Sequence, residues 1–212
     1  MSALLLLGIL LLAYTFGSVP VGLVVAWLKT GHDLRATGSG KTGATNVMRS
    51  AGRGWGFLTL VLDGLKALIA VLIATLLWPL SSLTIGTLSV GVPLVQSLAG
   101  GAAIIGHTRP VFAGFRGGRG VSSFFGTMCL LNLPVAFTGI VTLILVAGLS
   151  RFMSLGSIVA GLVTCVAMIA LYFLGRAPLP HVAYAVVVVG FIVYAHRDNI
   201  SRLRKGTERK LF

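Results

Sequence analysis

Long apolar runs follow one another through almost the whole chain, from Leu4 to Tyr194, with only short polar segments between them. An apolar run of about 20 residues is long enough to cross the hydrocarbon core of a bilayer as a helix. Hydrophobic residues make up 56% of the 212 residues and charged residues only 10%, whereas a soluble domain carries about 25% charged residues. The sequence therefore predicts an all-α, polytopic integral membrane protein that forms a single membrane-embedded domain over residues 1–212.

Five apolar runs are clear candidates for transmembrane helices, and one further region is ambiguous. The ambiguous region, 120–149, is interrupted near its middle by Asn132 and Pro134, so it forms either one kinked span or two short spans. The clear candidates cover approximately residues 3–28, 55–78, 83–105, 155–175 and 179–196.

The distribution of basic residues favours two spans in the region 120–149. Lys and Arg concentrate on the cytoplasmic side of membrane proteins. With the N-terminus outside, the polar segments 29–54 and 106–119 are cytoplasmic and the turn at 79–84 is external. A single crossing at 120–149 would leave the basic C-terminal tail outside, whereas two crossings return it to the cytoplasm. The sequence thus predicts seven transmembrane helices, with the N-terminus outside and the C-terminus cytoplasmic.

The chain is strongly basic, with 17 Lys and Arg residues against 4 Asp and Glu residues. Because the basic residues lie between apolar runs, they indicate topology in the lipid bilayer, and no nucleic-acid partner is expected. Cys129 and Cys165 lie in apolar runs without further ligands nearby, and the acidic residues are scattered. Neither a metal site nor a cofactor is therefore expected.

The first polar segment (29–54) contains "TGSGKTGATN", which combines glycines, hydroxyls and basic residues in a pattern suited to phosphate. Glycines allow backbone N–H groups to converge on an anion, and hydroxyl and guanidinium groups complete such a site. A nucleotide-binding P-loop is excluded because Arg35 stands where its first glycine is required and no βαβ unit surrounds it. A flexible loop facing lipid headgroups is the alternative. The candidate phosphate-binding residues are Gly38, Ser39, Gly40, Lys41, Gly43, Thr45, Asn46 and Arg49.

The second polar segment (106–126) contains a glycine turn with arginines directly before an apolar run. Backbone amides at the start of a helix bind anions together with arginine side chains. A basic loop that only fixes topology is the alternative. His107 is expected to be structural. The candidate residues are Gly117, Gly118, Arg119 and Gly120.

The third polar segment (196–208) begins at the end of the last apolar run. If the helix continues, His196 and Asn199 share one face a turn apart, where His196 could act as a base or orient a substrate hydroxyl. The basic side chains that follow are expected to contact anionic lipid. These are Arg202, Arg204 and Lys205.

Other polar residues lie within or beside the apolar runs. Asp63 and Lys66 are expected to pair with each other, because isolated charges are costly in a membrane. Ser154 precedes the run 155–175, where its hydroxyl could cap the helix or present an oxygen to a substrate. His32 and His181 are expected at the surface, with His181 outside.

Two anion sites at one membrane face could hold two phosphorylated molecules, while the apolar helices accept an acyl chain. This combination suits acyl transfer between a lipid-like phosphate and a small phosphate. A transporter or binder of small phosphorylated anions is the alternative. Transporters commonly have internal repeats and sites at the membrane midplane, whereas this sequence shows no convincing repeat.

The three polar segments resemble the motifs of the bacterial acyl-phosphate-dependent glycerol-3-phosphate acyltransferases (PlsY family). The matching stretches are "GSGKTGATNVMRSAG" (38–52), "GHTRPVFAGFRGGRGVSS" (106–123) and "HRDNISRLRKGTE" (196–208). The resemblance implies a seven-helix enzyme of the bacterial cytoplasmic membrane with its active site on the cytoplasmic face. Such an enzyme transfers a fatty acyl group from acyl phosphate to glycerol 3-phosphate. The products are 1-acylglycerol 3-phosphate and inorganic phosphate, in the first acylation step of phospholipid synthesis.

The resemblance also implies roles for individual residues. Ser39 and Arg49 would bind a substrate phosphate, with the backbone of residues 38–45 completing the site. The catalytic residues would be Arg119, Ser154, His196 and Asn199.

This chain departs from the family pattern at two positions. Lys41 follows "GSG" where the family usually has Asn, and Arg119 stands where the second motif usually has Lys. Both changes keep or add positive charge, so anion binding is expected to survive. Arg and Lys differ in hydrogen-bonding geometry, so substrate positioning is expected to respond to these changes.

Overall fold

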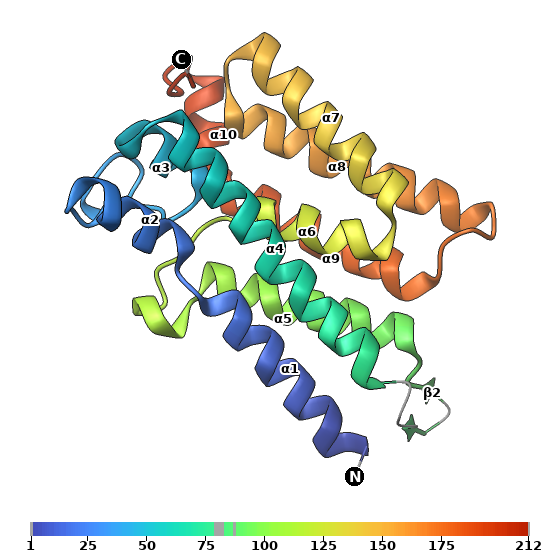
Figure 1. Cartoon of the computed structure of the whole chain (residues 1–212). Helices are drawn as coiled ribbons and strands as arrows, with labels where there is room; N and C mark the ends of the chain where they lie inside the picture. The colour runs from blue at the N-terminus through green and yellow to red at the C-terminus, as the bar shows by residue number, and fades with distance from the viewer. Residues whose placement is uncertain (1, 79–82, 87, 212) are drawn as a thin grey trace. The chain divides into compact units, whose positions relative to one another are not determined.

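The computed structural model describes residues 2–78, 83–86 and 88–211, which pack as two compact units (Figure 1). Unit 1 ends at Leu131 and unit 2 begins at Asn132. The described residues are mostly helical, as the sequence predicts, and the single domain over residues 1–212 stays a prediction.

The helices of unit 1 are α1 (Ser2–Ser18), α2 (Val21–Thr30), η1 (Leu34–Ala36), α3 (Ala44–Ala51), α4 (Arg53–Leu77), α5 (Val92–Thr108), η3 (Val111–Ala113) and α6 (Val121–Leu131). Its strands β1 (Thr84–Ile85) and β2 (Leu88–Ser89) pair in antiparallel orientation. The helices of unit 2 are α7 (Leu133–Ser150), α8 (Met153–Phe173), α9 (Leu179–Ala195) and α10 (Arg197–Arg204).

Several described helices are long and apolar enough to cross a membrane. There are four such segments, and a fifth if α9 and α10, which are bent by 57° at their junction, count as one span. The prediction of a multi-pass membrane protein is thus confirmed, while seven spans and their orientation stay predictions. The four segments are Ser2–Thr30, Arg53–Leu77, Leu133–Ser150 and Met153–Phe173.

Two predicted spans differ from the structure. The first is interrupted at Pro20, because proline has no N–H to donate and disfavours helical geometry at the residue before it. The span predicted at 83–105 becomes helical only at Val92, since the short β-hairpin precedes it. Most of the predicted turn at 79–84 lies outside the described residues.

The ambiguous region 120–149 contains two helices, α6 and α7. They are separated at Asn132, whose side-chain Oδ1 accepts a hydrogen bond from the Val135 N–H at 3.1 Å and so caps α7. Pro134 lies in the first turn of α7, where its missing N–H leaves no intrahelical acceptor unpaired. The break predicted at this sequence is confirmed.

Glycines let the helices of unit 1 approach one another closely. A Cβ atom on Gly17 of α1 would overlap the carbonyl group of Ala103 in α5, and one on Gly126 of α6 would overlap the carbonyl group of Gly64 in α4. Between membrane helices, close backbone packing supplies much of the attraction, because lipid tails are as apolar as the side chains. These contacts hold α1 against α5 and α4 against α6 within unit 1.

Candidate active site

The first polar segment is shaped by the side chain of Asn46, in the first turn of α3. Its Oδ1 accepts a hydrogen bond from the Ser39 N–H at 3.2 Å, and its Nδ2 donates to the carbonyl oxygens of Leu34, Thr37 and Lys41 at 3.2, 3.1 and 2.9 Å. Asn46 is 3% exposed. Because its amide group is used in this way, Asn46 shapes the loop, a role that no local sequence pattern indicates.

Two glycines of the loop adopt left-handed backbone geometry that other residues rarely tolerate. Gly38 has a φ of 59° and Gly40 has a φ of 66°. A Cβ atom on Gly38 would also overlap Oδ1 of Asn46. The turn therefore requires glycine at position 38 for both its backbone angle and its contact with Asn46.

Two backbone amides that were expected to bind phosphate instead donate hydrogen bonds within the loop. The Ser39 N–H bonds to Asn46, and the Gly40 N–H donates to the Thr37 carbonyl at 3.1 Å. The Asn46 N–H donates to the Gly43 carbonyl at 2.9 Å, whereas the amides of Ala44 and Thr45 precede the first intrahelical hydrogen bond of α3. The candidate anion-binding groups of this segment also include the amides of Ala44 and Thr45, the half-buried Ser39 hydroxyl and the exposed cations Lys41 and Arg49.

A hydrogen bond joins the first polar segment to the second. Arg35 pairs with Asp33 at 2.7 Å, and its Nη1 donates to the carbonyl oxygen of Ala113 at 3.3 Å. The hydrogen bond from Arg35 lowers the pKa of the Asp33 carboxyl. Both glycine-rich segments thus lie together in unit 1.

The glycine turn of the second segment packs directly on His107. The Gly118 N–H donates to the His107 carbonyl oxygen at 3.2 Å. A Cβ atom on Gly117 would overlap that carbonyl group, and one on Gly118 would overlap the imidazole Nε2. Gly120, with a φ of 87°, then leads into α6. The half-buried Arg119 lies within this turn.

Beneath the turn, His107 joins the ion pair that the sequence predicts between Asp63 and Lys66. Lys66 Nζ lies 2.7 Å from Asp63 Oδ1 and also donates to the carbonyl oxygen of Val19 at 2.8 Å. His107 Nδ1 lies 3.3 Å from the same carboxylate oxygen. All three side chains are buried, so the charges compensate one another inside unit 1. The prediction of the pair and of a structural His107 agrees with this arrangement.

In unit 2, the side chain of Glu208 brings together two candidate catalytic residues. Its Oε1 accepts hydrogen bonds from Ser154 Oγ at 2.8 Å and from Asn199 Nδ2 at 2.6 Å, while Arg202 Nε bonds to its Oε2 at 2.7 Å. The Glu208 side chain is only 4% exposed. Glu208 was not predicted as a site residue, although it ends the third motif.

Three hydrogen bonds determine the charge state of Glu208. Burial alone would raise the pKa of its carboxyl, but the donors Asn199, Ser154 and Arg202 stabilise the carboxylate and hold the pKa below its usual value. Ser154 therefore presents its hydroxyl to a carboxylate, and it does not cap α8. Arg202, expected to face lipid, instead forms an ion pair with Glu208.

The predicted face shared by His196 and Asn199 depends on a continuous helix, which the structure does not have. The chain bends by 57° between α9 and α10, and His196 lies at the bend. His196 is 2% exposed and its Nδ1 lies 2.8 Å from the carbonyl oxygen of Ile192, whereas Asn199 turns to Glu208. The two side chains thus make different contacts within unit 2.

The other two histidines, His32 and His181, differ in burial. His181, expected at the surface, is buried at 6% exposure in the first turn of α9, whereas His32 is exposed as predicted. Within residues 2–78, 83–86 and 88–211, no group of three or more His, Cys, Asp and Glu side chains is arranged to hold a metal ion.

Comparison with known proteins identifies the family. The family model for glycerol-3-phosphate acyltransferases matches residues 7–206. The chain belongs to this acyltransferase family. It is 44% identical over 206 residues to glycerol-3-phosphate acyltransferase 3 of Dehalococcoides mccartyi, covering 97% of this chain and 95% of the relative. It is 35% identical over 209 residues to the glycerol-3-phosphate acyltransferase of a Nostoc species, covering 96% and 91% of the two chains.

Two crystal structures of PlsY, an integral membrane glycerol 3-phosphate acyltransferase, share the fold of this chain. The glycerol 3-phosphate form matches with a TM-score of 0.83 and 35% identity, and the lysophosphatidic acid form with a TM-score of 0.80 and 33% identity. Each alignment covers 97% of this chain and 94% of the PlsY chain. The predicted membership of the family and the predicted acyltransferase activity are thus confirmed.

Proposed function

We propose that this family member transfers a fatty acyl group from acyl phosphate to the primary hydroxyl of glycerol 3-phosphate. The products are 1-acylglycerol 3-phosphate and inorganic phosphate. The observation that carries the proposal is the match to PlsY in its glycerol 3-phosphate form, at 35% identity and a TM-score of 0.83 over 97% of the chain. A second PlsY form, with lysophosphatidic acid, supports the same reaction from the product side.

In this proposal, unit 1 binds substrate phosphate through its two glycine-rich segments. The Ser39 hydroxyl, the Arg49 guanidinium and the first amides of α3 contact one phosphate, and Lys41 adds positive charge. The tight turn set by Asn46 supports this role because it fixes the position of Ser39. The loop glycines whose left-handed backbone angles permit this turn are Gly38 and Gly40, while Gly43 directly precedes α3.

The second segment of unit 1 contributes a further anion-binding turn. Gly117 and Gly118 lie directly on His107, so the backbone of this turn is fixed in position. Gly120 then directs the chain into α6, and Arg119 provides the charge that stabilises a phosphate group. A guanidinium donates through several N–H groups in one plane, so it binds phosphate in a different geometry from the lysine usual at this position.

The proposed reaction needs no covalent acyl-enzyme. The acceptor hydroxyl oxygen attacks the carbonyl carbon of the mixed anhydride, the bond from that carbon to the phosphate oxygen breaks, and phosphate leaves with the hydroxyl proton. Arginine side chains and backbone amides stabilise the charge that develops on the leaving phosphate. The donor is already reactive, so a strong protein base is unnecessary.

The residues of unit 2 serve this reaction by orientation. Ser154 donates its hydroxyl hydrogen to Glu208, whose lowered pKa makes it a weak base, so Ser154 is not activated as a nucleophile. Asn199 is held by the same carboxylate and retains its side-chain oxygen as a hydrogen-bond acceptor. His196 orients the acceptor hydroxyl.

We place the enzyme in the bacterial cytoplasmic membrane, with seven spans, an external N-terminus and all three polar segments on the cytoplasmic side. The basic character of those segments supports this topology. In a variant without Cys129 and Cys165, single cysteines at Arg49, Arg119 and the exposed Arg197 should each react with a membrane-impermeant maleimide only in inside-out vesicles. Labelling of these positions from opposite sides would contradict the topology.

A reconstitution assay tests the reaction. Purified protein in detergent receives palmitoyl phosphate and radiolabelled glycerol 3-phosphate, and the expected result is an organic-extractable radioactive lipid with stoichiometric release of phosphate. The Arg49→Gln variant should lose most of this activity. A transporter or a binding protein would produce no extractable product, and that result would overturn the proposal.

A further inference from the structure

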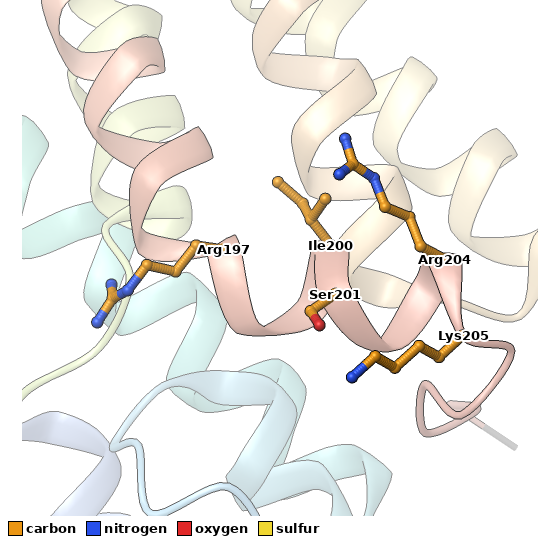
Figure 2. Close-up of a pocket in the computed structure, with 5 residues that line it drawn as sticks. All are labelled: Arg197, Ile200, Ser201, Arg204 and Lys205. Carbon is orange, nitrogen blue, oxygen red and sulfur yellow. The ribbon is translucent and has the colours of Figure 1, made fainter.

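One side of α10 forms a basic hollow that has no role in the proposed acyl transfer. The hollow has a volume of about 460 Å³ and is lined by Arg197, Ile200, Ser201, Arg204 and Lys205. Figure 2 shows Arg197 at the start of α10 and Arg204 and Lys205 at its end, with Lys205 extending back towards Ser201. These positions recur at intervals of three or four residues, so they lie along one side of a helix.

The two sides of α10 make different contacts. Asn199 and Arg202 bond to the buried carboxylate of Glu208 and hold one side of the helix to unit 2. On the other side, no ion pair within the described residues involves Arg204 or Lys205, although both are exposed. The hollow therefore presents positive charge that the described part of the chain leaves uncompensated.

The chemistry of the lining indicates an anion with an attached apolar group. A guanidinium, an ammonium and a hydroxyl are the usual donors to phosphate oxygens in proteins. The half-buried Ile200 adds an apolar side chain to the same hollow. A phosphodiester with a glycerol and acyl portion uses both kinds of lining, whereas free phosphate uses only the polar part.

The position of the hollow favours a membrane lipid as the source of this phosphate. It follows α9, whose 17 residues extend about 25 Å and end next to the first cation of the hollow. Arg197 lies 4.7 Å from the ring centroid of Tyr194, a side chain that is 63% exposed. Exposed tyrosines at the ends of apolar helices are typical of the headgroup region of a bilayer.

We propose that the basic hollow of α10 binds the headgroup phosphate of an anionic phospholipid. Arg204 and Lys205 contact the phosphate, Ser201 donates its hydroxyl, and Ile200 contacts the first carbons of the lipid. Because the opposite side of α10 carries Asn199, the bound lipid stabilises the helix that also holds the Glu208 cluster.

A lipid titration tests this site in the intact protein. The protein in detergent, with saturating glycerol 3-phosphate to fill the proposed substrate site, is titrated with short-chain phosphatidylglycerol while its thermal unfolding is followed. The unfolding temperature should rise and saturate, because a ligand that binds only the folded state stabilises it according to its concentration and affinity. Phosphatidylcholine of the same chain length, which has no net charge, should have little effect.

Matched variants separate a specific site from general charge attraction. Arg204→Gln/Lys205→Gln should weaken the apparent affinity for phosphatidylglycerol roughly 30-fold, since each cation near an anionic headgroup contributes a factor of about five to six. Lys29→Gln/Arg176→Gln removes the same two charges from exposed positions outside the hollow and should leave the affinity unchanged. Equal weakening in both variants would overturn the proposal.

Two further readouts assign the ligand and separate this proposal from the enzymatic one. Inorganic phosphate alone should stabilise the protein much less than phosphatidylglycerol at the same concentration, and equal affinity would overturn the lipid assignment. In the same detergent without added lipid, the Arg204→Gln/Lys205→Gln variant should retain acyltransferase activity, because neither side chain contacts the reactants. Loss of activity in that variant with intact lipid binding would contradict the hollow as the lipid site.

Discussion

Replacement of Gly38 by alanine tests how the phosphate-binding loop is held. The new Cβ atom would overlap Oδ1 of Asn46, an atom that cannot move away freely because the Asn46 amide makes four hydrogen bonds to the loop. At about 1 kcal/mol for each hydrogen bond, displacement of this side chain costs about 2 to 4 kcal/mol. The left-handed backbone angle adds about 1 to 2 kcal/mol for any residue with a Cβ atom.

Gly31 provides the matched control for this backbone strain. Its φ of 71° resembles the 59° of Gly38, but a Cβ atom at position 31 would meet no other atom within 4 Å. Gly31→Ala therefore carries the strain without the collision. The difference between the two variants isolates the collision with Asn46.

Steady-state kinetics with each substrate varied in turn measure the effect. We expect Gly38→Ala to lower kcat/KM by at least about 30-fold relative to Gly31→Ala, which corresponds to the lower limit of about 2 kcal/mol. In a double-mutant cycle, Gly38→Ala should add little to Asn46→Ala, because both act on the same hydrogen bonds. Equal kinetics for the two glycine variants, or full additivity with Asn46→Ala, would refute the reasoning.

Further predictions concern the buried charges and the bend. Lys66→Met should lower the free energy of unfolding by about 3 to 5 kcal/mol, because it leaves a buried carboxylate at Asp63 without its lysine partner; thermal unfolding in detergent measures this, and a Lys66→Met variant as stable as Lys66→Met/Asp63→Asn would contradict it. The folded pKa of Glu208 lies below the ordinary 4.5, so its carboxylate contributes stability that is complete above pH 4.5 and is lost as the pH falls through the folded pKa. Glu208→Gln should remove this acid-dependent loss from unfolding temperatures recorded between about pH 3 and 7, and an unchanged profile would exclude Glu208 as its source. His196→Ala should raise KM for glycerol 3-phosphate while kcat stays within about tenfold; a kcat loss of about 10³ with unchanged KM would instead identify a catalytic base.

The helices were predictable because hydropathy and helix-breaking residues act locally. The break at Asn132 followed from a polar residue and a proline within one apolar region, and the structure has helix ends there. The hairpin before α5 was missed because mean hydropathy alone assigns residues 83–90 to the following apolar run. The alternation of apolar and hydroxyl residues in this stretch favours short strands instead.

The polar contacts of the candidate site were less predictable. The pair of Asp63 and Lys66 follows from their spacing on one helix, whereas the contact of Ser154 with Glu208 joins residues 54 positions apart. No local pattern specifies such a contact. Asn46 was chosen as a ligand from its residue type, but its hydrogen bonds are directed into the loop, and only the three-dimensional course of the chain determines that direction.

The position of Glu208 in the chain has a consequence for biosynthesis. Ribosomes extend a protein from its N-terminus, so α8, α9 and α10 are complete before Glu208 is added. Until then, Ser154, Asn199 and Arg202 lack the carboxylate that joins them. The cluster in unit 2 is therefore assembled after the helices that carry it, and a nascent chain released before residue 208 would contain all the helices that the structure describes yet lack this cluster.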